Sequence, residues 1–112
     1  MGIAAMMAVS MMGINASAYT NLYKSGANCT AYKSTSSSVY ASTSSADGSS
    51  NSVSVTVTLY YKKNGVKYST GSGNSGKTAV STNCSTPSGG TFQSATIVHK
   101  YKSATVFTGS LV

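Results

Sequence analysis

Hydrophobic and polar side chains alternate most regularly between Val53 and Thr70. A repeat of two residues puts successive side chains on opposite faces of a β-strand, so this segment has one apolar face and one polar face. The polar row is built from Ser, Thr, Tyr and Lys side chains. The apolar row consists of Val53, Val55, Val57, Leu59 and Tyr61.

An Asn-Gly pair at positions 64–65 interrupts this alternation. Both residue types tolerate the positive φ angles of a type I′ turn, which joins two antiparallel strands by a two-residue loop. Such a loop pairs Tyr61 with Tyr68 on the apolar face. The sequence therefore predicts a β-hairpin at the centre of a sheet, with its apolar row in the core.

The rest of the chain carries further strand patterns separated by turns. Alternating segments predict strands over Lys77–Thr86 and Thr91–Lys102, and looser patterns lie within Thr20–Ala46. The Asp-Gly pair at 47–48 indicates a hairpin turn, and the Gly-rich run 71–76 indicates a flexible loop. No apolar stripe with a 3.6-residue period follows the N-terminal segment. These patterns predict an all-β fold, an antiparallel β-sandwich or small barrel of about six or seven strands.

The N-terminal segment has a different composition. Residues 1–18 are apolar and end in Ala16-Ser17-Ala18, a pattern typical of signal-peptide cleavage sites. No Lys or Arg precedes this pattern, so the segment is either part of a signal peptide whose start was placed too late or a retained apolar arm. We expect a signal-peptide-like segment at residues 1–18, cleaved or truncated, a single β-sandwich domain at residues 19–112, and a secreted, extracellular protein.

The charge of the chain is almost entirely positive. Eight lysines, no arginine and a single acidic residue give a net charge of +7. A basic surface favours anionic partners, although a charge of this size also serves solubility alone. Without arginine, the chain lacks the side chain that best recognises phosphate and guanine in nucleic acids. We therefore expect a partner such as an anionic cell-envelope polymer or a surface protein, and no nucleic acid.

The predicted core is small, because Ser and Thr occupy 37 of the 112 positions and the chain has no Trp. A domain with so thin a core is marginally stable unless a covalent link reinforces it. Cys29 and Cys84 are therefore predicted to form a disulfide if the protein is secreted. Two buried free thiols are the alternative.

Few residues are available for catalysis or metal binding. Asp47 is the only acid, and its place in a Gly/Ser turn favours a structural role in which it accepts backbone hydrogen bonds. His99, the only histidine, lies in an apolar row and is interpreted as a packed or edge-exposed sheet residue rather than as a general base. A metal site needs three or four ligands. The sequence thus predicts a non-enzymatic protein with no cofactor and no metal site.

The polar face of the predicted hairpin is the best candidate for binding. Tyr60, Lys62 and Lys67 are expected on this face, where an aromatic ring can stack on a sugar or base and lysines can hold anions. Cross-strand pairs that only stabilise a solvent-facing sheet are the alternative. These three side chains are the predicted binding residues.

Several short motifs resemble those of uncharacterised small secreted proteins of Gram-positive bacteria. They are Ala16-Ser17-Ala18 before Tyr19, Tyr60-Tyr61 ahead of a Gly turn, and His99-Lys100-Tyr101 in the late strand, followed by a short strand over Ala104–Ser110. The resemblance implies secretion and a β-sandwich, and it supplies no catalytic residues. The chain is also similar to lactococcin 972-type bacteriocins in being small, secreted, basic and rich in β-structure.

Three functions fit these patterns. The first is a secreted, non-enzymatic protein that binds a cell-surface polymer, glycan or partner protein through its Lys/Tyr face. The second is a bacteriocin-like antibacterial protein. The third is a structural subunit of an extracellular matrix, which would assemble through the edges of its sheets.

Overall fold

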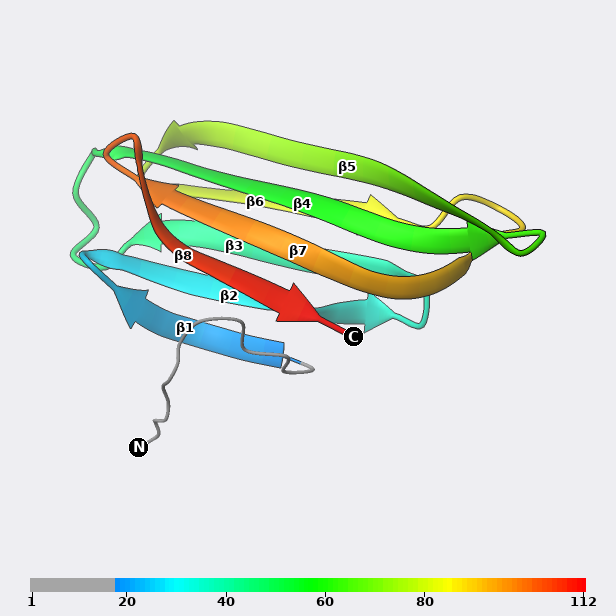
Figure 1. Cartoon of the computed structure of the whole chain (residues 1–112). Helices are drawn as coiled ribbons and strands as arrows, with labels where there is room; N and C mark the ends of the chain where they lie inside the picture. The colour runs from blue at the N-terminus through cyan, green and yellow to red at the C-terminus, as the bar shows by residue number, and fades with distance from the viewer. Residues whose placement is uncertain (1–17) are drawn as a thin grey trace.

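The computed structural model describes residues 18–112, in which eight β-strands form two four-stranded antiparallel sheets (Figure 1). The predicted β-sandwich is confirmed, with eight strands where about six or seven were expected. Of the predicted signal-peptide-like segment, residues 1–17 lie outside the described residues, and Ala18 is the first residue of β1. Within residues 18–112, no helix has the length and apolar character needed to cross a membrane.

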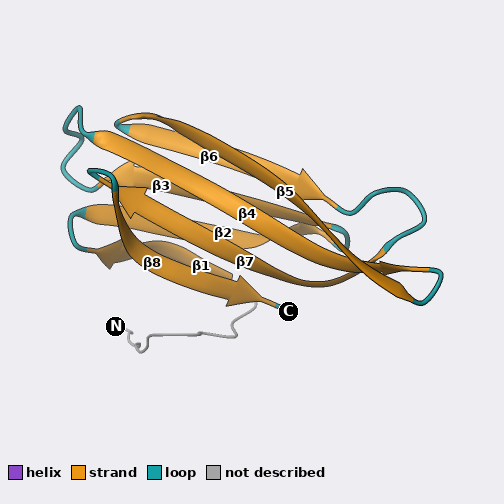
Figure 2. Cartoon of the chain, turned by 45° about the horizontal axis from the view of Figure 1, so that its top comes forward, coloured by secondary structure: helices purple, strands orange, loops and turns teal. Residues whose placement is uncertain are grey.

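The two sheets pack face to face and are called sheet 1 and sheet 2. Their strands run along the 45 Å long axis of the molecule, and the loops gather at its two ends (Figure 2). Sheet 1 has the order β1-β2-β3-β6 and consists of β1 (Ala18–Lys24), β2 (Ala27–Thr35), β3 (Ser38–Ser45) and β6 (Ala79–Ser85). Sheet 2 has the order β5-β4-β7-β8 and consists of β4 (Ser52–Lys63), β5 (Val66–Lys77), β7 (Thr91–Tyr101) and β8 (Ala104–Leu111).

The predicted central hairpin is confirmed as β4 and β5. Asn64 and Gly65 have φ angles of 54° and 79°, as the two positive-φ positions of a type I′ turn require. Tyr61 pairs with Tyr68 in the predicted register, and β4 lies between β5 and β7. The regular alternation of β4 explains its central position, because its apolar row can cover the core while both of its edges are paired.

Two turn predictions are wrong. The Gly-rich run 71–76 is not a loop, because β5 continues through it and stays paired with β4 as far as Ser52 and Lys77. Backbone hydrogen bonds to a well-patterned neighbour are sufficient here, since pairing needs no side chains. The Asp-Gly pair at 47–48 is not a hairpin turn either. It lies in the loop that leads from β3 in sheet 1 to β4 in sheet 2, because β3 is already paired on both sides, with β2 and β6.

The core lies between the sheets and is filled mainly by two rows of sheet 2. Val55, Val57 and Leu59 of β4 are fully buried, and the predicted row of β7 is buried from Ala95 to Tyr101. Sheet 1 contributes smaller side chains, so the core is as thin as the composition predicts. The sheet 1 side chains in the core include Ala27, Cys29, Ala31, Val39 and Ala41.

The predicted disulfide is wrong, because Cys29 and Cys84 are both free and buried. They lie on opposite sides of β3, where Cys29 pairs with Thr43 and Cys84 pairs with Val39. Two strand spacings across the sheet and a four-residue offset along β3 separate their Cα atoms by roughly 16 Å. A disulfide requires less than about 7 Å. Burial raises the pKa of the Cys29 thiol to about 12 and also raises the pKa of Cys84, so both thiols stay protonated.

Candidate binding site on the outer face of sheet 2

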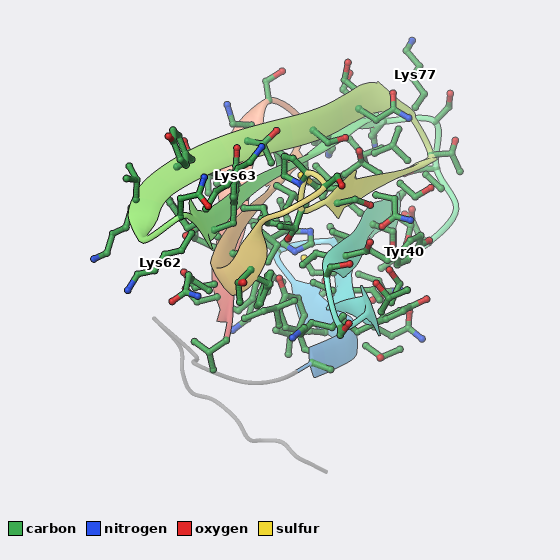
Figure 3. All side chains as sticks on the ribbon, turned by 90° about the vertical axis from the view of Figure 1, so that its right-hand side faces the viewer. Tyr40, Lys62, Lys63 and Lys77 are labelled. Carbon is green, nitrogen blue, oxygen red and sulfur yellow. The ribbon has the colours of Figure 1, made fainter. Side chains whose placement is uncertain are left out.

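Lys62 and Lys67 lie directly opposite each other near the end of the β4–β5 hairpin. Both side chains are exposed, and strand alternation places them on the outer face of sheet 2, away from the core row. Figure 3 shows Lys62 directed away from the body of the sandwich. Like charges directly opposite each other destabilise a sheet, so a bound anion would relieve the repulsion between these two ammonium groups.

Tyr60 lies on the same face, next to the lysine pair, and is 43% exposed. It lines a pocket of about 230 Å³ together with Tyr61, Lys67, Tyr68 and Gln93. The Tyr61 and Tyr68 rings are stacked, with centroids 5.6 Å apart and an interplanar angle of 24°. The pocket is lined mainly by apolar atoms, which suits the apolar face of a ligand such as a sugar ring, and the lysine pair beside it can hold a negative charge.

Three pocket residues, Tyr61, Tyr68 and Gln93, were not among the binding residues predicted from the sequence. The register placed Tyr68 on the apolar face, yet its side chain is 48% exposed because the hairpin end projects beyond sheet 1 (Figure 1). Gln93 lies at a β-bulge, where the β4–β7 register shifts between Tyr60 and Tyr61 and leaves Gln93 without a partner on β4. A bulge redirects side chains, but a single sequence does not reveal where the register shifts.

No protein-family model, curated protein or solved structure matches the chain. The resemblances to small secreted proteins of Gram-positive bacteria and to lactococcin 972-type bacteriocins therefore stay predictions from the sequence. Functional inference rests on how charged and aromatic side chains are distributed over the two outer faces.

The outer face of sheet 1 differs from that of sheet 2 because, within the described residues, its outward rows hold tyrosines and no lysine. Tyr32 and Tyr40 are cross-strand partners with ring centroids 5.1 Å apart and planes at 33°. The two lysines in the strands of sheet 1, Lys24 and Lys33, lie instead over phenylalanine rings, with Nζ 5.3 Å and 4.2 Å from the ring centroids. Figure 3 shows Tyr40 and Lys62 on opposite sides of the sandwich.

His99 is buried in the core and joins the two sheets. Its Nε2 is 2.8 Å from the hydroxyl oxygen of Tyr19 in β1, and its Nδ1 is 2.8 Å from Oγ1 of Thr43 in β3. Burial lowers the pKa of the imidazole to about 4, so His99 is neutral at pH 7. The prediction of a packed sheet histidine is confirmed, and its contacts give it a structural role.

Asp47 also has the structural role predicted for it. Its Oδ1 accepts hydrogen bonds from the backbone N–H of Ser49 and the hydroxyl of Ser45, each with a donor–acceptor distance of 2.9 Å. Hydrogen bonds from the Ser49 side chain, the Ser49 backbone N–H and the Ser45 side chain, in that order of importance, lower the pKa of the carboxyl group to about 2. In the part of the chain that the structure describes, no three His, Cys, Asp or Glu side chains are grouped so that they could hold a metal ion.

Proposed function

We propose that this protein is a secreted, non-enzymatic binding module that attaches to an anionic polymer or glycan of a cell surface. Tyr60, Lys62 and Lys67 would form the binding site at the end of the β4–β5 hairpin. The observation that carries this proposal is a pair of facing lysines beside a tyrosine-lined pocket. The strand partner of each lysine is the other lysine, so neither ammonium group faces an acidic side chain in sheet 2. Both ammonium groups can therefore bind an anion.

The distribution of acid in the chain supports an anionic ligand. Asp47 is the only acidic residue, and it lies in the loop before β4, whereas the lysine pair lies near the other end of this strand. The length of β4, from Ser52 to Lys63, corresponds to about 36 Å. Surface charges further apart than about 8 Å are largely screened at physiological ionic strength, so Asp47 does not neutralise the pair.

Binding to purified bacterial cell wall tests the proposal. The double variant Lys62→Glu with Lys67→Glu is expected to bind at least about tenfold more weakly, because two attractive contacts become repulsive. High salt should weaken wild-type binding similarly if charge dominates.

The matched control is Lys63→Glu with Lys102→Glu. Both control lysines are exposed and lie off the outer rows of sheet 2, and the change in net charge is the same. Wild-type binding that resists both salt and the Lys62/Lys67 reversal would contradict the proposal. Equal losses in the control and the test variant would show that net charge alone drives binding.

A structural subunit is the second candidate, and the edge strand β5 favours it. This strand spans 12 residues at the edge of sheet 2. From Tyr68 to Gly76 it contains no charged residue and no proline. Natural proteins usually block such edges, because unpaired backbone groups can add another strand. Light scattering over a range of concentrations should show assembly that Ser69→Lys reduces, whereas a monomer at every concentration would exclude this role.

A further inference from the structure

A second pair of lysines, Lys77 and Lys100, lies on the same outer face as the hairpin-end pair. They flank the beginning of β4, where Lys77 pairs with Ser52 and Lys100 pairs with Ser54. Two strand spacings and a two-residue offset place their Cα atoms about 12 Å apart. Two long side chains at this separation can converge on one anionic group between them.

A pocket of about 450 Å³ lies at this position. Serine hydroxyls around it can donate hydrogen bonds to an anion, and the two ammonium groups supply charge. The pocket is open to solvent, and its serine and lysine side chains can bind a charged group that enters from the outer side of the sheet. The serines that line it together with Lys77 and Lys100 are Ser52, Ser54, Ser75 and Ser103.

Among the described residues, the outer surface between the two lysine pairs carries no charged side chain, and glycines without side chains form part of it. Eight to ten residues of β4 separate Lys62 from Ser54 and Ser52, which corresponds to about 26–33 Å. Along this path Thr56 and Thr58 of β4 face two glycines of β5, which have no side chain to obstruct a ligand. A chain lying on the face would therefore meet hydroxyl groups between two positively charged ends.

The twist of the sheet restricts what can touch both pairs. Figure 3 shows Lys62 and Lys77 both directed away from the sandwich but in different directions, as expected for a face that rotates along its strands. A flat, rigid surface cannot contact both ends of such a face at once. A flexible single chain can follow it.

We propose that the outer face of sheet 2 binds one flexible, linear, phosphate-bearing polymer along its length, with Lys62–Lys67 at one end and Lys77–Lys100 at the other. This proposal rests on the proposed function and names the ligand class and its path. Lysine binds phosphate as a compact point charge, so a phosphate group can be held without the planar fork by which arginine recognises carboxylate, phosphate and guanine. Within residues 18–112, the outer rows of sheet 2 carry one aromatic side chain, Tyr60, and the Tyr61 and Tyr68 rings lie beside it at the hairpin end. Aromatic side chains therefore do not recur along the path, as the stacking of successive bases would require. The polymer is therefore assigned as one without nucleobases.

Length-defined linear polyphosphate is the probe that tests the proposal. One preparation should be shorter than about 20 Å when extended and the other longer than about 50 Å, so that only the second spans both lysine pairs. Wild-type protein should bind the long chain about 100-fold more tightly than the short one, because the second contact becomes intramolecular. Calorimetry or fluorescence anisotropy measures both dissociation constants.

Three double variants, each losing two positive charges, separate the possible outcomes. Lys62→Gln with Lys67→Gln, and equally Lys77→Gln with Lys100→Gln, should remove most of the roughly 100-fold preference for the long chain. Lys63→Gln with Lys102→Gln should keep it. All six side chains are exposed, so each variant is expected to fold, and its thermal transition confirms this.

Each departure from this pattern has a distinct meaning. If the Lys77/Lys100 variant behaves like the control while the Lys62/Lys67 variant loses binding, the extended path is wrong and the proposed function stands. If neither variant differs from the control, both proposals fail. If a single-stranded oligonucleotide of matched length binds more tightly than polyphosphate, the assignment of a polymer without nucleobases is overturned.

Discussion

The two outer faces of the sandwich are built from similar strands and differ in charge. Both are rich in Ser and Thr, so composition does not separate them. The outer face of sheet 1 carries the Tyr32–Tyr40 pair, and the lysines of its strands pack over phenylalanine rings. The outer face of sheet 2 carries four exposed lysines, Lys62, Lys67, Lys77 and Lys100.

Strand register produces this difference. A shift of one residue moves a side chain to the other face of a sheet. The two lysines in the strands of sheet 1 lie on its inner face, whereas four of the five in the strands of sheet 2 lie on its outer face. Lys33, for example, lies 4.2 Å from the centroid of the Phe92 ring, whereas Lys62 extends into solvent. The net charge of +7 therefore does not show that exposed positive charge is concentrated on the outer face of one sheet.

The largest expected effect comes from breaking the contact that holds the two faces together. His99→Leu leaves the hydroxyls of Tyr19 and Thr43 without their imidazole partner between the sheets. The free energy of unfolding should fall by about 3 kcal/mol, since unpaired polar groups in a core are costly. Urea denaturation at pH 7 measures this loss, and a value below about 1 kcal/mol would show that the sheets do not depend on His99.

The same histidine predicts a pH dependence of stability. The pKa of His99 is about 4 in the folded state and 6.5 when exposed, so below pH 6.5 the unfolded chain takes up a proton that the folded protein does not. The stabilisation is fully present above pH 6.5 and should be lost towards pH 4, by up to about 1.4 kcal/mol per pH unit. His99→Leu should abolish this slope. A wild-type stability that is constant from pH 7 to pH 4 would contradict the buried, neutral state of the imidazole.

A smaller effect separates the position of charge from its amount. Lys62→Gln with Lys67→Gln and Ser34→Glu with Ser81→Glu both lower the net charge by two, the first on sheet 2 and the second on sheet 1. The first variant should bind polyphosphate about tenfold more weakly, and the second less than about threefold. Equal losses in titration calorimetry would show that the two faces are functionally equivalent.

Replacing one lysine in each sheet tests the same difference between the two faces. Lys33→Ala should lower the free energy of unfolding by about 1 kcal/mol, because its side chain packs on Phe92, and should leave anion binding unchanged. Lys62→Ala should change stability by less than about 0.5 kcal/mol and weaken binding. Denaturation and binding measurements on both variants test whether Lys33 contributes mainly to stability and Lys62 mainly to binding. If the two variants lose stability equally, the assignment of Lys33 to packing is incorrect.

The smallest expected effect concerns the cysteines, both of which lie in sheet 1 and face the core. Because Cys29 and Cys84 are free, a reducing agent should change the melting temperature by less than about 1 °C. A disulfide typically contributes about 2–4 kcal/mol, and its loss would lower the melting temperature by about 10 °C or more. A shift of that size would show that the cysteines are linked.

The β4–β5 hairpin could be predicted from the sequence because two local signals agree there. The alternation of β4 determines its buried row, and Asn64-Gly65 determines the turn and therefore the pairing of Lys62 with Lys67. Local signals of this kind are sufficient when partner strands are adjacent in the chain.

Features that depend on partners distant in the sequence could not be predicted in this way. The Gly-rich part of β5 has no strand pattern of its own, and its pairing with β4 brings Lys77 onto the binding face. The separation of Cys29 and Cys84 follows from the order of strands around β3, which neither cysteine encodes. Gln93 enters the pocket through a register shift between β4 and β7 that arises only when both strands are in place.

We expect anions to bind to the outer face of sheet 2 and not to lysines in general. A titration of the isotope-labelled protein with long-chain polyphosphate, followed by NMR, tests this claim most directly because every lysine is observed at once. Chemical shifts should change at Lys62, Lys67, Lys77 and Lys100 and along the threonines between them, with little change at Tyr32 and Tyr40. Changes spread evenly over all eight lysines, or concentrated on the outer face of sheet 1, would contradict it.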